Sequence, residues 1–225
     1  MLINTQNGSL AVQDGRSVAP FIDSLLKLPS FATRIATQDF HPQNHISFAS
    51  NHPAPNNKPF ESSIDMNNPA PGKEAEVKEQ RLWPVHCVAG TKGAEIIPEI
   101  DSTHIDAYVR KGMDARVEMY SAFADAFGNL DPSVRASSVD VDIASCLREK
   151  NVTDVFVVGL AGDYCVKHTA IDAAKVRFKS WIIEDGTKCV DPGSGWQKTK
   201  DDLKAAGVSV IGKDSDEMLK LKTSA

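Results

Sequence analysis

The sequence predicts an α/β protein in which helices cover both faces of a parallel sheet. Through residues 141–212, apolar and β-branched runs alternate with longer segments of helical periodicity. The runs contain few polar residues, which is typical of parallel strands that are buried on both faces. Strands that alternate with helices of this length indicate crossover connections, because parallel neighbours need them.

The amino-terminal half contributes one helix and two further strands. The segment 33–40, TRIATQDF, is typical of a short strand that ends in polar residues, and 104–112, HIDAYVRKG, could hold another. Before them, apolar residues recur at helical spacing and Pro29 follows as a stop, so we expect a one-sided helix there. Its apolar positions are Val18, Phe21, Ile22, Leu25 and Leu26.

The carboxyl-terminal half has a cleaner alternation. We expect helices over 141–150, 164–177 and 195–207, and strands over 153–160, 179–185 and 208–212. Sites in such sheets lie at the carboxyl ends of the strands. The residues that follow 33–40 and 153–160 are therefore expected to open onto one crevice.

Residues 51–81 interrupt this pattern. They contain five prolines and little periodicity. The segments on either side belong to the same α/β pattern, so we expect a long loop inside one domain, and long ordered loops are often functional.

Composition restricts the class of protein. A chain of 225 residues with 41% hydrophobic residues predicts a single domain over residues 1–225. A net charge of -5 offers no basic patch for nucleic acid, and no apolar run approaches the roughly 18 residues of a membrane span. Four cysteines without a CxxC pair are typical of a reducing compartment. We expect a cytoplasmic protein, with the nucleus and the peroxisome as alternatives, that binds neither nucleic acid nor membranes.

Asp39 and His41 in QDFH form the first candidate site. Residues two apart in an extended chain point to the same side, so this carboxylate and imidazole can converge on Zn²⁺, Mn²⁺ or Fe²⁺. Such a short pair more often consists of surface or capping residues. His45 and His52 follow nearby, and we expect them to be loop residues rather than ligands.

His86, Cys87 and Lys111 are weaker candidates when taken singly. A lone histidine after the rigid Trp83–Pro84 turn is more often a hydrogen-bonded structural residue than a ligand. Cys87 is a rival ligand, but adjacent residues of an extended chain face opposite ways. Lys111 precedes Gly112 at a strand end, which would direct its ammonium into the crevice, although most lysines are solvated.

Cys165 lies in VVGLAGDYCVKH, where a strand passes into a helix. Unpaired N–H groups and the helix dipole at such a position favour a thiolate, and the same groups can stabilise an oxyanion. The commoner alternative for a free cysteine is a buried, inert one. His168 lies three residues further on and is poorly oriented to act as its base.

Four segments, taken together and in order, resemble a known family. They are similar to the nicotinamidases of the isochorismatase-like cysteine hydrolase superfamily, in particular the eukaryotic type, over about residues 8–212. The resemblance implies a three-layer α/β/α fold and the hydrolysis of nicotinamide to nicotinate and ammonia, a step of NAD salvage and pyridine nucleotide biosynthesis. The segments are QDFHPQNHISFASNH, LWPVHCVAGTKGAEI, KGMDARVEMYSAF and VVGLAGDYCVKHTAIDAA.

The resemblance also implies a role for each matching position. One divalent metal ion would hold the pyridine nitrogen and a network of waters. Zn²⁺ is the expected ion, with Mn²⁺ and Fe²⁺ as alternatives. A cysteine would attack the amide carbon and form a thioester, while a lysine beside it favours the thiolate. Asp39, His41 and His86 match the metal ligands, Cys165 matches the nucleophile and Lys111 matches the lysine. The backbone N–H groups of Ala161 and Cys165 match the oxyanion hole, which the family forms beside a cis peptide bond, here Leu160–Ala161. Trp83 and Tyr120 match the aromatic residues that flank the ring.

One part of the family pattern has no match. The family places its general base, an aspartate, at the end of the first strand, whereas MLINTQNGSLAV aligns beyond that motif or sets Asn4 in place of the acid. We therefore expect a sheet without its first central strand and an impaired activity. The alternatives are another isochorismatase-like small-amide hydrolase and a catalytically silent paralogue that binds metal and nicotinamide. The sequence does not determine the oligomeric state, and a homo-oligomer is one of the alternatives.

Overall fold

The parallel strands form two sheets rather than one. The structure is a computed structural model and describes residues 8–223. β1 (Ile35–Asp39) pairs in parallel with β4 (Ala107–Lys111), while β5 (Asp154–Leu160), β6 (Lys179–Lys188) and β7 (Ser209–Ile211) form a second parallel sheet in that order. No strand of residues 8–223 lies between β1 and β5. Residues 1–7, with Asn4, lie outside the described residues.

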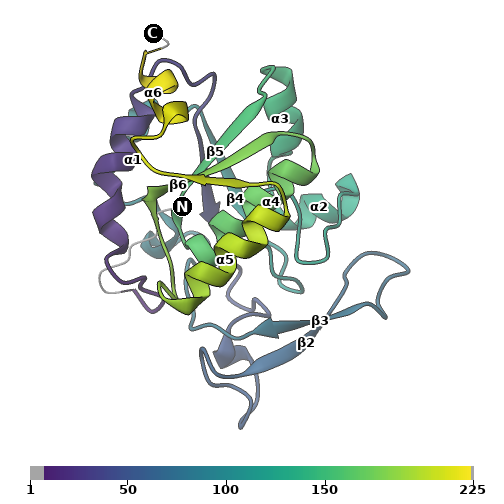
Figure 1. Cartoon of the computed structure of the whole chain (residues 1–225). Coiled ribbons are helices and arrows are strands. Elements are labelled where there is room, and N and C mark those ends of the chain that lie inside the picture. The colour runs from purple at the N-terminus through teal and green to yellow at the C-terminus, as the bar shows by residue number, and fades with distance from the viewer. Residues whose placement is uncertain (1–7, 224–225) are drawn as a thin grey trace.

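Helices cover both faces of the larger sheet (Figure 1). Ile182 and Ile183 are consecutive in β6 and fully buried, so their side chains point to opposite faces. Ile182 packs in a cluster with Leu203 of α5, and Ile183 packs in another with Met218 of α6. The described α-helices are α1 (Ala19–Leu26), α2 (Pro132–Ser138), α3 (Ile143–Glu149), α4 (Lys167–Lys175), α5 (Ser194–Ala205) and α6 (Asp216–Thr223).

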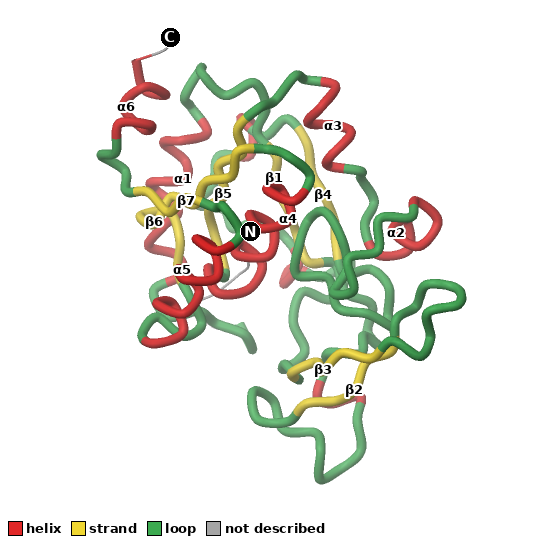
Figure 2. Tube along the Cα trace, turned by 45° about the vertical axis from the view of Figure 1, so that its right-hand side comes forward, coloured by secondary structure: helices red, strands yellow, loops and turns green. Residues whose placement is uncertain are grey.

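The expected loop over 51–81 is wrong in part, because it contains a β-hairpin. β2 (Ser63–Asn67) and β3 (Val77–Arg81) pair in antiparallel fashion and project away from the parallel strands (Figure 2). In the two strands only Met66 and Gln80 are buried, and the other residues are exposed or partly exposed. β2 (SIDMN) alternates polar and apolar residues over five positions, but β3 (VKEQR) does not, so only one of the two strands carries the pattern of a half-buried strand.

The other expected elements are confirmed with shifted ends. The helix expected over 164–177 begins as a wider turn at Gly162–Val166 before α4, and the strand expected over 179–185 continues to Lys188. The sequence reasoning missed α2 and α6. The start of α2 is stabilised by residues at its amino end. Asp131 caps the helix by accepting a hydrogen bond from Ser133 N, and Pro132 occupies its first turn.

Among the described residues, no helix is long and apolar enough to cross a membrane.

Truncation of Ile182 tests the importance of the β6 core. We expect Ile182→Ala to lower the free energy of unfolding by about 2–5 kcal/mol, because it removes a fully buried side chain between β6 and two helices. Urea unfolding followed by circular dichroism measures the change. Val77→Ala, at a position that is 49% exposed, is the control and should change stability by less than about 0.5 kcal/mol. Equal losses in both variants would contradict this account of the core.

Candidate active site

A buried ion pair joins the ends of β1 and β4. Asp39 and Lys111 are partners in the register of the two strands and both side chains are almost completely buried. The Lys111 ammonium Nζ donates to Asp39 Oδ1 at 2.5 Å and to the Met119 carbonyl at 2.8 Å. It also lies 3.6 Å from the Cys165 sulfur, which follows β5. The pair therefore places a fixed positive charge beside the thiol.

The two charges hold each other ionised. Burial alone would raise the pKa of Asp39, but Lys111, His41 and His86 lower it to about 2. Burial alone would lower the pKa of Lys111, but the charge of Asp39 and its hydrogen bond raise it above its ordinary value. Both groups are therefore charged at neutral pH.

Cys165 is held in the Gly162–Val166 turn directly after β5. Burial raises the pKa of its thiol to about 12, and the carboxylates of Asp39 and Glu118 raise it further, whereas Lys111 lowers it. Burial thus outweighs the ammonium, so Lys111 and the helix start do not by themselves make a thiolate at neutral pH. His168 stacks on the Tyr120 ring, and burial lowers its pKa to about 4.

The peptide bond between Leu160 and Ala161 is cis, as the resemblance implied. Within residues 8–223, no backbone or side-chain acceptor bonds the Ala161 N–H. This N–H and Cys165 belong to one small cavity.

Two histidines beside the ion pair share one hydrogen-bonding pattern. His41 Nδ1 bonds the Gly112 carbonyl and His86 Nδ1 bonds the Pro84 carbonyl, each at 2.8 Å. Their ring centroids are 5.0 Å apart, and His41 Nε2 lies 3.9 Å from Asp39 Oδ2. Gly112 has φ +69° and a side chain there would overlap the His41 ring, so only glycine fits this position.

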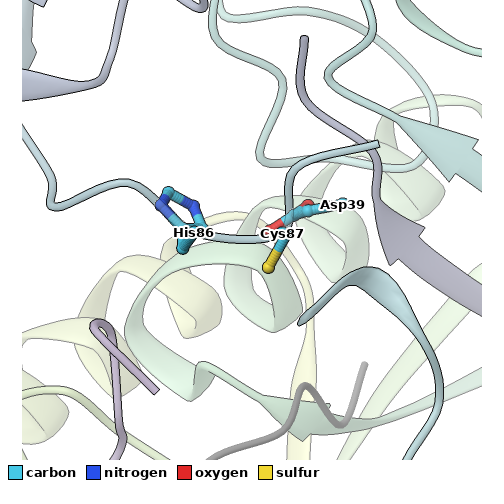
Figure 3. A group of neighbouring side chains, drawn as sticks. All are labelled: Asp39, His86 and Cys87. Carbon is cyan, nitrogen blue, oxygen red and sulfur yellow. The ribbon is translucent and has the colours of Figure 1, made fainter. Parts of the chain in front are cut away.

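Cys87 is closer to this centre than the sequence reasoning allowed. The expectation that Cys87 faces away from His86 is wrong, because Cys87 has φ +47° and the chain is not extended there. Ligand atoms of Asp39, His86 and Cys87 all lie within 4.8 Å of one another (Figure 3). Burial raises the pKa of the Cys87 thiol well above its ordinary value, so the sulfur is a protonated and weak donor.

His45 and Glu118 form a second layer behind His41. The His45 ring lies 4.1 Å from that of His41, and ligand atoms of His41, His45 and Glu118 lie within 4.8 Å of one another. His45 is held by Ser47 and the Val117 carbonyl, and burial lowers its pKa to about 4. His45 is therefore a packed part of the site and not simply a loop residue. His52 instead bonds the Ile46 carbonyl.

Aromatic rings form one wall of the cavity. Trp83 Nε1 and Gln80 Nε2 both donate to the Tyr120 hydroxyl at 2.9 Å, which fixes the orientation of the two rings. Tyr164 packs edge-on against Trp83 with centroids 4.9 Å apart. Sequence reasoning missed Tyr164 and Glu118, although both lie inside the quoted segments. The cavity, of about 50 Å³, is lined by Leu10, Val12, Asp39, Trp83, His86, Glu118, Tyr120, Leu160, Ala161, Tyr164, Cys165 and Val190.

Among the described residues, ligand atoms lie within 4.8 Å of one another in the groups Asp39–His86–Cys87 and His41–His45–Glu118, which divide the expected metal ligands Asp39, His41 and His86 between them. His41 and His86 each use Nδ1 on a backbone carbonyl, which leaves Nε2 as the free donor atom, an arrangement typical of metal-binding histidines. Burial and His86 lower the pKa of His41 to about 4 against the opposing effect of Asp39, so the ring is neutral as a ligand must be. One carboxylate and two imidazoles suit Zn²⁺ and related ions.

Comparison with known proteins finds one matching domain family and several similar enzymes. It matches the isochorismatase domain over residues 66–215. It is 36% identical over 207 residues to a nicotinamidase of Acinetobacter baylyi (92% of this chain, 86% of that protein), and 32% identical over 212 residues to the nicotinamidase of Saccharomyces cerevisiae (92% of each). The yeast nicotinamidase bound to the inhibitor nicotinaldehyde matches its fold with a TM-score of 0.83 at 32% identity, over 94% of this chain and 96% of that one.

The chain therefore belongs to the isochorismatase family, and its three-layer α/β/α fold is confirmed. Within that family it is one of the nicotinamidases.

Removal of the buried ammonium tests the ion pair. We expect Lys111→Met to lower the free energy of unfolding at pH 7 by about 3–5 kcal/mol, because the Asp39 carboxylate would be left buried without its partner. Denaturant titration of both proteins measures the difference. Lys58→Met, which breaks the exposed pair with Glu61, is the matched control and should leave stability nearly unchanged.

The same pair predicts a pH dependence. The pKa of Asp39 is lowered on folding to about 2, so its contribution is fully present above about pH 4 and is lost as the pH falls through about 2. The stability difference between the native protein and Lys111→Met should shrink over that window. A difference that is constant from pH 7 to pH 2 would contradict the pairing.

Proposed function

We propose that this protein hydrolyses nicotinamide to nicotinate and ammonia. The observation that carries the proposal is the 3.6 Å contact between Lys111 Nζ and Cys165 Sγ at a cavity with Trp83 and Tyr120 in its wall. A thiol, a cation and flat aromatic rings suit a nucleophilic attack on an aromatic amide. The relatives from Acinetobacter baylyi and yeast, which are nicotinamidases, support the same substrate.

The reaction would proceed through a thioester on Cys165. The sulfur loses its proton and bonds to the amide carbon, and the carbonyl oxygen becomes an oxyanion near the Ala161 N–H. The C–N bond then breaks and ammonia leaves with the proton that it gains. A water molecule adds to the thioester, the C–S bond breaks, and nicotinate and the Cys165 thiol are released.

The removal of the proton from the Cys165 thiol is the step that the described residues support least. Among residues 8–223, the carboxylates that line the cavity are those of Asp39 and Glu118, and Asp39 accepts the short hydrogen bond from Lys111. The Cys165 thiol has a pKa near 12 and so needs a base. We infer that proton transfer limits the rate of this chain, since a positioned general base usually contributes roughly 10²–10⁴-fold.

A metal ion would complete the binding site. Asp39, His41 and His86 would hold it, with zinc preferred, and when bound it would supply a Lewis-acid contact for the pyridine nitrogen. The aromatic wall of Trp83 and Tyr120 then orients the ring so that the amide carbon faces Cys165.

Ammonia release tests the reaction. We expect slow but measurable release from nicotinamide, and Cys165→Ala should abolish it, because the thioester cannot form. Cys146→Ala, at a partly buried cysteine of α3, is the control and should leave the rate unchanged. Binding of nicotinamide without any release would favour the silent paralogue, and release that survives in Cys165→Ala would overturn the mechanism.

Metal content distinguishes the two sets of candidate ligands. We expect about one Zn²⁺ per chain after dialysis, and an affinity at least roughly tenfold lower in His86→Ala because a donor is lost. Cys87→Ser should keep the native affinity, since its thiol is protonated. Elemental analysis and calorimetric titration with Zn²⁺ measure both. Loss of the metal in Cys87→Ser would instead assign the ion to Asp39, His86 and Cys87.

A further inference from the structure

One face of the β2–β3 hairpin contacts the wall of the active-site cavity. Met66 and Gln80 are the buried residues of its two strands. Met66 lies opposite Lys78 in the register, two residues from Gln80, so both side chains project from the same face. The Met66 sulfur accepts a hydrogen bond from the Glu118 N–H at 3.2 Å, and Gln80 Nε2 donates to the Tyr120 hydroxyl at 2.9 Å. The hairpin therefore bonds both residues that this segment contributes to the cavity.

The hydrogen-bonding roles of Gln80 and Tyr120 are fixed by their other partners. Gln80 Nε2 also lies 2.6 Å from the Arg81 carbonyl, which can only accept, so this end of the amide is the nitrogen. Trp83 Nε1 is a donor only, and it lies 2.9 Å from the same hydroxyl. The Tyr120 oxygen thus accepts from both Gln80 and Trp83, which uses both of its lone pairs.

Gln80 is the partner that ties the Tyr120 hydroxyl to the hairpin. Trp83 is itself part of the cavity wall, whereas Gln80 is not among the residues that line the cavity and belongs to a paired strand. The Tyr120 ring is also stacked on His168, with centroids 5.4 Å apart and an interplanar angle of 23°. The hydroxyl bonds and this stacking together set the angle of the ring.

The setting of this hydrogen bond makes it effective in holding the ring. Gln80 is 3% exposed, so water does not compete strongly for its amide. The cavity has a volume of only about 50 Å³, so a small rotation of a wall ring changes a large part of its space. Without Gln80, the Tyr120 hydroxyl would keep one of its two donors, and the ring would be less firmly held.

We propose that Gln80 is a positioning residue for the aromatic ring of the substrate. It acts through Tyr120, because its hydrogen bond holds that ring at the angle at which the cavity accepts a flat ring beside Trp83. Within residues 8–223, its side-chain bonds go to Arg81 and Tyr120 rather than to the nucleophile or its lysine, so it affects binding and not the bond-breaking steps. The inference rests on the proposed function, because the ring is taken to be that of nicotinamide.

Calorimetric titration with nicotinamide tests the role of Gln80. The titrated proteins all carry Cys165→Ala, so that no ligand is consumed. We expect Gln80→Met, which keeps a side chain of similar length without the donor, to bind roughly threefold to tenfold more weakly because the bond to Tyr120 is lost. In chains that keep Cys165, KM should rise by the same factor while kcat stays within about twofold. A purely structural role would instead lower the amount of folded protein and the apparent kcat without changing the affinity.

Lys78→Met is the matched control. Lys78 lies on the same face of the same strand, and its ammonium donates to the Ala126 carbonyl at 2.7 Å. The substitution removes one hydrogen bond between the hairpin and the rest of the chain without removing a bond to Tyr120, so the affinity and KM should equal the native values. Circular dichroism and urea unfolding check that the variants are folded to the same extent.

A double-mutant cycle shows whether Gln80 acts through Tyr120. Tyr120→Phe keeps the ring and removes the oxygen that accepts both hydrogen bonds. In that background, Gln80→Met should cause no further loss of affinity, because the bond is already absent. Gln80→Glu is a second variant, whose carboxyl oxygen can accept from the Tyr120 hydroxyl, so the contact is kept with reversed direction and the affinity should stay within about twofold of the native value.

Three results would overturn the inference. The first is equal affinity for nicotinamide in Gln80→Met and the chain with Gln80. The second is an equal loss in Lys78→Met, which would assign the effect to docking of the hairpin. The third is a full additional loss from Gln80→Met in the Tyr120→Phe background. Binding without turnover in the native chain would count against the proposed function alone and leave the titrations to decide the inference, whereas absence of binding would count against both.

Discussion

The buried contact between Lys111 and Asp39 is the interaction on which the site depends. It joins the last residues of two paired strands, so the strand register itself sets the position of both charges. Each partner then has a second task. The ammonium reaches the sulfur of Cys165, and the second carboxylate oxygen faces the Nε2 atom of His41. A charge buried without a partner is strongly unfavourable, so neither residue can be replaced alone at low cost.

The same contact links the two parallel sheets. Lys111 belongs to the β1–β4 sheet, whereas Cys165 follows β5 of the other sheet. Helices pack apolar side chains against both faces of β6, so the β5–β6–β7 sheet is stabilised by its own apolar clusters. The facing edges of β1 and β5 have no strand between them in residues 8–223.

Much of the fold could be predicted because its signals are local. The spacing of apolar residues predicts β5, β6 and α5 without any knowledge of tertiary contacts. The β2–β3 hairpin was missed because only β2 (SIDMN) alternates polar and apolar residues, whereas β3 (VKEQR) is held by its pairing with β2 and exposes most of its side chains. Within the site, the QDFH pattern indicated Asp39 and His41. The approach of Cys87 was missed because it depends on a positive φ angle, which the sequence around a non-glycine residue does not reveal.

By itself, the sequence determined the parallel strands, the helices α1, α3, α4 and α5, the family, and the residue types that reach the carboxyl ends of the strands. Only the tertiary structure decided how those residues act on one another. It showed that burial outweighs Lys111 at the Cys165 thiol, and that Glu118 and Tyr164 share the cavity with it. The physical reason is that periodicity and motifs reflect interactions between neighbours in the chain. Desolvation, charge pairing and open strand edges depend instead on residues that are distant in the sequence and adjacent only after folding.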